Sequence, residues 1–148
     1  MKIALKYGVL ITLAVIVWVV TAHLLVPNPC SRFHVVGPIV FFNLLEAGGI
    51  YFGISARKRE AEDQLPFKAG LKTGVGIAFV YGIGSCLFFL AVISVVGSRM
   101  MCVEPGVAAL TFWQTAALAF LGQFGGALVL GLIYSTIIAF FLAARRAR

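Results

Sequence analysis

Four long apolar stretches alternate with short polar segments along this chain. Residues 7–26, 73–98 and 105–144 contain no Asp, Glu, Lys or Arg, and the stretch 36–56 contains only Glu46. A helix of about 20 residues crosses the apolar core of a bilayer, and each stretch reaches that length. Strands of a membrane barrel would alternate with a period of two residues, which these stretches do not. The pattern therefore predicts an all-α, polytopic membrane protein with four transmembrane helices in a bundle of two hairpins.

Prolines, caps and charged residues set the expected helix boundaries. Pro27 and Pro29 cannot continue a helix and end the first one. Pro38 is expected at an early position of the second helix, where its missing donor costs nothing. Thr111 and Gln114 have capping-box spacing at the start of the fourth. We expect a single membrane domain over residues 1–148, with helices at about 3–26, 37–57, 66–97 and 112–144.

Composition and charge support the membrane class and suggest an orientation. The chain is 61% hydrophobic and only 11% charged, whereas soluble domains carry about 25% charged residues. The net charge is +7, yet only Arg32 and Arg99 lie in the loops of one side. The other ten cations are Lys2, Lys6, Arg57, Lys58, Arg59, Lys68, Lys72, Arg145, Arg146 and Arg148. The positive-inside rule then places both termini and the 57–72 loop in the cytoplasm. The cations indicate topology and attraction to anionic lipid, not nucleic-acid binding.

Glu46 is the sharpest candidate for a functional residue. It lies 11 residues before Arg57, so about 16 Å from the inner charged rim by helical rise. A charged carboxylate at that depth is costly. Asn43 lies one turn earlier on the same face, and the pair is suited to hold a proton, a cation or a polar ligand. Two other readings stay open: a protonated Glu46 bonded to a neighbouring helix with Asn43 as interhelical contact, or a contact site for another subunit.

The fourth helix is long, and its small residues suggest close packing. Its 33 residues would extend roughly 50 Å, so we expect it to tilt, project outward or bend, most readily at Gly125–Gly126. Gln123 lies 22 residues before Arg145, or about 33 Å from the inner rim, so it belongs to the outer leaflet and is predicted to contact another helix. Gly49 and Gly53, like Gly122 and Gly126, have the small-xxx-small spacing that allows close helix approach. These four glycines are also predicted to contact other helices.

The cysteines and histidines suggest one disulfide and no metal site. Cys30 and Cys102 lie in the two loops expected outside, where an oxidising periplasm permits a bond between them. Mass analysis of alkylated protein without reduction tests this pairing, because alkylation of both outer thiols, Cys30 and Cys102, would exclude it. No C-x-x-C spacing is present. His23 and His34 lie near the same side as Cys30, but their spacing matches no recognisable metal site.

No catalytic motif is present, and the soluble loops are too short to form a catalytic domain. The chain has no G-x-S-x-G, P-loop or H-E-x-x-H. We therefore expect a non-enzymatic protein without cofactors. The leading hypothesis is a small accessory or structural subunit that packs against a larger membrane complex. The alternative is a small proton- or cation-coupled transporter or channel. In that case Glu46 would be the binding group, and the protein would form a homo-oligomer.

A resemblance to a known family adds to this interpretation. The signature segments are Gly53-Ile54-x-x-Arg57-Lys58-Arg59-Glu60, then Leu65-x-Phe67-Lys68-x-Gly70-Leu71-Lys72-Thr73-Gly74, with Lys6-Tyr7-Gly8 near the start. They resemble the four-helix bacterial membrane proteins grouped as domain of unknown function 4199. The resemblance implies four spans and an inner-membrane location. It implies no reaction and assigns no role to the cysteines.

Overall fold

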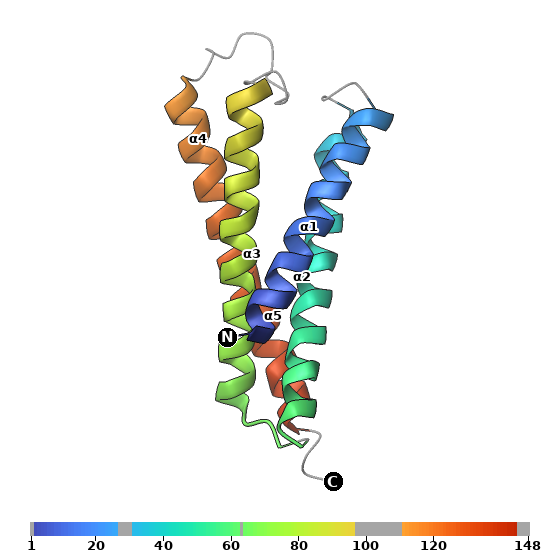
Figure 1. Cartoon of the computed structure of the whole chain (residues 1–148), viewed down its shortest axis with the longest axis vertical. Coiled ribbons are helices and arrows are strands. Elements are labelled where there is room, and N and C mark those ends of the chain that lie inside the picture. Colours follow the sequence, from blue (N-terminus) through green and yellow to red (C-terminus); the bar gives the residue numbers. More distant parts are fainter. Residues whose placement is uncertain (1, 27–30, 63, 97–110, 145–148) are drawn as a thin grey trace.

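The computed structural model describes residues 2–26, 31–62, 64–96 and 111–144, and these form helices without any strand (Figure 1). Along the chain they are α1 (Lys2–Leu25), α2 (Arg32–Glu60), α3 (Phe67–Val96), α4 (Phe112–Phe120), the π-helical segment η2 (Leu121–Gly125) and α5 (Gly126–Ala144). Because α4, η2 and α5 are continuous, the described chain contains four helices long and apolar enough to cross a membrane. The predicted all-α fold with four spanning helices is confirmed.

The second helix begins earlier than the sequence predicted. We expected a start near residue 37 with Pro38 in the first turn, but α2 begins at Arg32 and Pro38 lies inside it. The reason is a local cap, since the Ser31 side chain accepts a hydrogen bond from the backbone N–H of His34 at 3.3 Å. Such a cap satisfies one of the free donors of the first turn and fixes the start. The placement of Pro38 at the beginning of the helix was wrong.

The fourth span begins as predicted and contains an irregular turn. Thr111 and Gln114 form a complete capping box before α4. The helix then changes to π-helical hydrogen bonding in η2 and returns to α-helix at Gly126. The predicted weak point at Gly125–Gly126 therefore lies at the end of this segment. Single π-turns inside α-helices occur often at functional sites.

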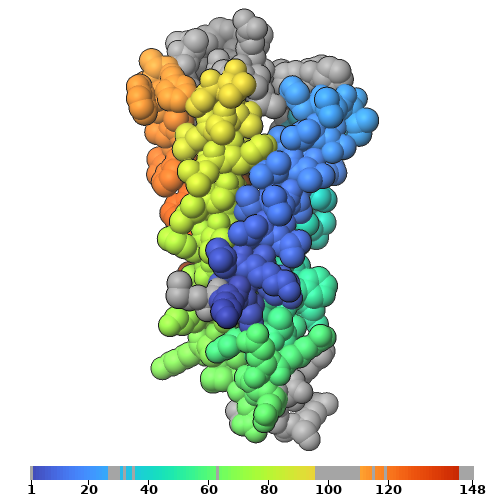
Figure 2. All heavy atoms as spheres, viewed as in Figure 1, coloured from blue at the N-terminus to red at the C-terminus, as the bar shows by residue number. Residues whose placement is uncertain are grey.

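The helices pack closely at one end of the bundle and separate toward the other. α3 is central and contacts α1, α2, α4, η2 and α5, whereas α4 contacts only α3 and η2 within the described chain. Figure 1 shows α3 and α4 diverging from α1 and α2 at the end opposite the C-terminus. Figure 2 shows the same separation between the yellow end of α3 and the blue α1. We name the closely packed end, which carries Arg57, Lys58 and Lys72, the basic end.

The core lies where the helices are close, and the outer surface is apolar. Buried side chains from all four spans meet there, including Val15, Ile54, Ile77, Tyr81 and Ala139. Most exposed side chains along the spans are Leu, Val, Ile and Phe. Such a surface suits lipid, because bilayer tails are as apolar as these side chains.

Candidate functional site

Glu46 is buried in the middle of the bundle. It lies on α2, its exposed fraction is 3%, and its Oε1 atom has no hydrogen-bond partner among the described residues. The close neighbour of this oxygen is Gly131 on α5, where an added Cβ would lie 2.8 Å from Oε1. A buried polar atom without a partner is uncommon in native structures and requires an explanation.

A pocket of about 310 Å³ lies beside Glu46. α2, α3, η2 and α5 all contribute to its walls. Along α2 the lining extends from Glu46 to Pro38, which corresponds to about 12 Å of helix directed away from the basic end. The polar side chains that line the pocket are Asn43, Glu46, Tyr81 and Gln123. We call this space the Glu46 pocket.

Tyr81 and Gln123 connect α3 to the π-helical segment on one wall. The Gln123 Nε2 amide donates a hydrogen bond to the Tyr81 hydroxyl at 3.3 Å. Tyr81 is 2% exposed, and it lines the same pocket as Glu46. The amide oxygen of Gln123 remains an acceptor beside the pocket.

Asn43 and Tyr134 connect α2 to α5 on another wall. The Tyr134 hydroxyl donates to Asn43 Oδ1 at 2.8 Å, and the amide nitrogen of Asn43 donates to the Ile39 carbonyl of its own helix. Both polar ends of the Asn43 side chain are therefore bonded within the protein. Glu46 and Asn43 share one helix face, as expected, but Asn43 joins helices while Glu46 Oε1 has no such bond.

The pocket is rich in acceptors and holds no cation of its own. None of the described residues that line it is Lys, Arg or His. The carboxyl group of Glu46 and the amide oxygen of Gln123 provide acceptors, and Tyr81 adds a hydroxyl. Groups of this kind suit a proton, a small cation or a ligand with donor groups. The described residues contain no group of three His, Cys, Asp or Glu able to hold a metal ion.

The candidate glycines behave in two ways. An added Cβ at Gly49 would overlap Ile11, and one at Gly53 would overlap Ile77 and approach Tyr7. This pair therefore lies at close contacts of α2 with α1 and α3. At Gly122 and Gly126 an added Cβ would meet nothing within 4 Å. Within the described chain these two glycines make no close helix contact, and they line the Glu46 pocket.

The sequence predicted that Gln123 lies nearer the outer surface than Glu46 and contacts another helix, and Gln123 bonds to Tyr81 on α3. Because Lys58 Nζ bonds to the Leu142 carbonyl, the two residues mark a common level on α2 and α5. Gln123 lies 19 residues before Leu142, and Ile39 lies 19 residues before Lys58. Gln123 is therefore at about the level of Ile39, which is farther from the basic end than Glu46. The pocket is long enough to include both.

The sequence analysis did not identify Tyr81 and Tyr134. Tyrosine is enriched at membrane interfaces, but both of these residues lie well inside apolar helices. A buried tyrosine hydroxyl generally needs a hydrogen-bond partner. Their unusual depth was therefore a signal of an internal polar site that could have been noticed.

The predicted disulfide falls outside the described residues, as both Cys30 and Cys102 do, and the pairing stays a prediction. Cys86 lies buried in α3 as a free thiol, with its Sγ atom 3.9 Å from the Phe120 carbonyl. The rings of His23 and His34 lie with centroids 6.1 Å apart.

Comparisons with known proteins identify a family. A family model with the description "Protein of unknown function (DUF4199)" matches residues 6–103, which include Asn43, Glu46 and Tyr81 but not Gln123. No curated protein and no solved structure matches the chain. Since the match covers more than half of the sequence and the four apolar helices agree with the predicted architecture, the chain belongs to the DUF4199 family.

Proposed function

We propose that this multi-pass membrane protein binds a proton or a small cation at Glu46 and acts as a small transporter or channel. One observation carries the proposal: a buried carboxyl group, with an unpartnered oxygen, faces a pocket without any lining cation. The sequence alone favoured an accessory subunit. The geometry of the Glu46 pocket favours the transport hypothesis.

The energetic argument concerns what would hold a carboxyl group in this position. Removing a polar group from water without a compensating hydrogen bond costs roughly 2 to 7 kcal/mol. A purely structural role for Glu46 would be expected to offset that cost with a bond to a neighbouring helix, as Asn43 does with Tyr134. A bound proton or cation supplies an alternative compensation. Ionisable residues inside spans commonly mark ion pathways for this reason.

The shape of the pocket supports access from one side of the membrane. Its lining follows α2 from Glu46 toward Pro38, away from the basic end. On that side α4 has no described contact with α1 or α2. We propose that the protein lies in a bacterial inner membrane and that its basic end faces the cytoplasm, because cytoplasmic loops are enriched in Lys and Arg. The Glu46 pocket would then open toward the outside. No covalent chemistry is required.

Flux measurements on reconstituted protein test this proposal. Proteoliposomes containing the wild type, Glu46→Gln or the control Glu62→Gln would be assayed for movement of H⁺, Na⁺ and K⁺ under an applied gradient. Glutamine keeps the size of glutamate but cannot hold a proton or a charge, so Glu46→Gln is expected to abolish flux. Glu62 is exposed in the loop after α2, and its variant is expected to retain flux.

Two results would count against transport at Glu46. Wild-type flux no higher than that of protein-free liposomes, for all three ions, would contradict transport itself. Full flux in Glu46→Gln, with unchanged elution in size exclusion, would contradict the role of this residue.

A second candidate, the small accessory subunit, is favoured by a different observation. α4 packs only on α3 and η2 within the described chain, which leaves one side available for a helix of a larger complex. Isolation in mild detergent at native expression, followed by mass spectrometry, tests this candidate. A stoichiometric larger complex whose recovery changes in Glu46→Gln would favour it, and a lone homo-oligomer would exclude it.

A further inference from the structure

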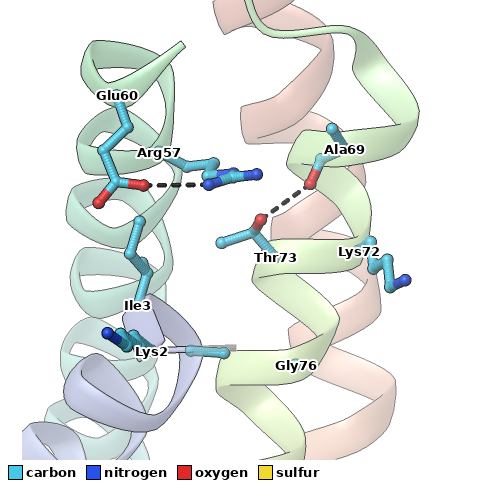
Figure 3. Close-up of a pocket in the computed structure, with 9 residues that line it drawn as sticks. Lys2, Ile3, Arg57, Glu60, Ala69, Lys72, Thr73 and Gly76 are labelled. Carbon is cyan, nitrogen blue, oxygen red and sulfur yellow. Dashed lines mark hydrogen bonds and ion pairs between the residues drawn. The ribbon is translucent and has the colours of Figure 1, made fainter.

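A second cavity lies at the basic end, separate from the Glu46 pocket. Its volume is about 560 Å³, and its walls come from the start of α1, the end of α2 and the start of α3 (Figure 3). Its lining includes the charged residues Lys2, Arg57, Glu60 and Lys72, together with Thr73 and Gly76 on α3. We call it the basic cavity.

Three cations from three different helices line this cavity. Lys2 belongs to α1, Arg57 to α2 and Lys72 to α3, whereas Glu60 is the single acid among the lining residues. Figure 3 shows the Arg57 guanidinium directed into the space between α2 and α3, whereas the side chains of Lys2 and Lys72 extend away from it on opposite sides. The described lining therefore carries a net charge of +2 (three cations and one carboxylate). A positive lining with a guanidinium directed into the space suits an anion.

Glu60 occupies only part of the Arg57 donor set. Arg57 Nη1 bonds to Glu60 Oε2 at 3.0 Å, and the two side chains are 50% and 57% exposed. An exposed pair of this type contributes about 0 to 1 kcal/mol, so an incoming anion can compete for the guanidinium. A guanidinium has five N–H donors, and its planar fork matches phosphate well. Arg57 is therefore the main candidate for direct contact.

Small residues leave the room that the ligand would occupy. Gly76 lies at the base, where an added Cβ would be 3.2 Å from the Cβ of Ala4, so α1 and α3 approach closely there. Ala69 and Thr73 form part of the α3 wall, and the Thr73 hydroxyl donates to the Ala69 carbonyl at 2.9 Å. The direct anion contact would therefore come from Arg57, and Lys2 and Lys72 would add positive charge at the rim of the cavity.

The depth of the cavity indicates where the anion comes from. The lining residues lie at the ends of the apolar spans Lys2–Leu25 and Val36–Glu60 and at the beginning of Phe67–Val95. This is the level of lipid headgroups. On α1, Leu5 follows the lining residues Ile3 and Ala4, and it is exposed and suited to contact an acyl chain.

We propose that the basic cavity binds the phosphate group of an anionic phospholipid. Basic pockets between spanning helices are suited to such headgroups. Free phosphate shares the same chemistry, but it lacks the acyl chain that Leu5 would contact. This inference does not rest on the role of Glu46.

Lipid titrations on the full chain test the proposal with charge-matched variants. Protein in neutral detergent would be titrated with phosphatidylglycerol or phosphatidylcholine, and native mass spectrometry would count the bound lipids. Two triple variants to glutamine have equal net charge: Lys2, Arg57 and Lys72 are replaced in the cavity variant, and Lys6, Arg59 and Lys68 in the control. Each cation near an anionic lipid contributes about a fivefold gain in affinity. Three such factors multiply to about 100-fold, so the cavity variant is expected to bind phosphatidylglycerol up to about 100-fold more weakly. The cations replaced in the control do not line the cavity, and the control is expected to remain within about threefold of wild type.

One further variant is expected to bind the lipid more tightly, a result that misfolding could not produce. Glu60→Gln removes the acid from the cavity and releases Arg57, so it is expected to tighten phosphatidylglycerol binding about fivefold. Equal weakening in both triple variants would show diffuse charge attraction and overturn the proposal. Unchanged binding in Glu60→Gln would also overturn it. If inorganic phosphate alone binds and displaces the lipid, the ligand of the cavity is free phosphate and the lipid proposal is overturned.

Discussion

Gly131 on α5 is predicted to be indispensable for the packing around Glu46. An alanine Cβ at this position would overlap the Cβ of Ala78 on α3 and would lie 2.8 Å from Glu46 Oε1. Ala78 is fully buried, and its Cβ is fixed to the backbone, so no rotamer change relieves the overlap. In Gly131→Ala, α3 and α5 must therefore separate, and this helix pair shares the most extensive contact of the bundle.

The expected cost follows from two opposing effects. Inserting a methyl group into a well-packed interior costs about 1 to 3 kcal/mol, and the rigid neighbour Ala78 places this case toward the upper end. Replacing a helical glycine with alanine gains up to about 1 kcal/mol. The net prediction is a loss of about 1 to 2 kcal/mol of unfolding free energy. Gly48→Ala is the matched control, because an added Cβ at Gly48 meets nothing within 4 Å and only the gain remains.

Equilibrium unfolding in mixed micelles, with increasing SDS and circular dichroism as the readout, measures both variants on one scale. Gly131→Ala is expected to be less stable than Gly48→Ala by about 2 to 3 kcal/mol. Equal stability of the two variants would refute the packing argument. It would mean that α3 and α5 do not approach at Gly131 and that Glu46 Oε1 is not confined there.

Two other substitutions test local interactions. Tyr134→Phe removes the hydrogen bond to Asn43 and is expected to lower the unfolding free energy by about 0.6 kcal/mol, the average for such bonds between membrane helices; an unchanged SDS midpoint would contradict the contact. Thr111→Ala removes the N-cap of α4 and is expected to destabilise its first turn by about 1 kcal/mol. Amide hydrogen exchange should rise in that turn alone, and unchanged exchange would exclude the capping box.

The spanning helices could be predicted from the sequence because their signal is local. Long stretches without charges are rare in soluble proteins, and the bilayer thickness converts their length into a span. The capping box at Thr111 and Gln114 was likewise recognisable from spacing, and it is present in the structure. These features depend on residues within a few positions of one another, so one sequence contains all of the information.

The boundary of α2 shows where local reasoning is insufficient. Pro38 suggested a helix start because a proline inside a helix removes one hydrogen bond. The Ser31 cap instead starts the helix at Arg32, five residues before the predicted start at residue 37, and proline is tolerated in spanning helices when other groups satisfy the freed carbonyl. Whether such satisfaction exists depends on residues outside the segment.

The role of Glu46 could not be decided from the sequence for the same reason. A carboxyl group in an apolar stretch gives one signal whether it is bonded to a neighbour or faces an open pocket. The atoms that distinguish the two cases lie on α5 and η2, about 80 residues away along the chain. Gly131 leaves space for Oε1 without providing a donor side chain, and Gly122 and Gly126 leave space in the Glu46 pocket itself. A donor side chain at Gly131 would favour a bonded, structural Glu46. With glycine at that position, Glu46 Oε1 has no partner among the described residues, and this is the property on which the transport hypothesis depends.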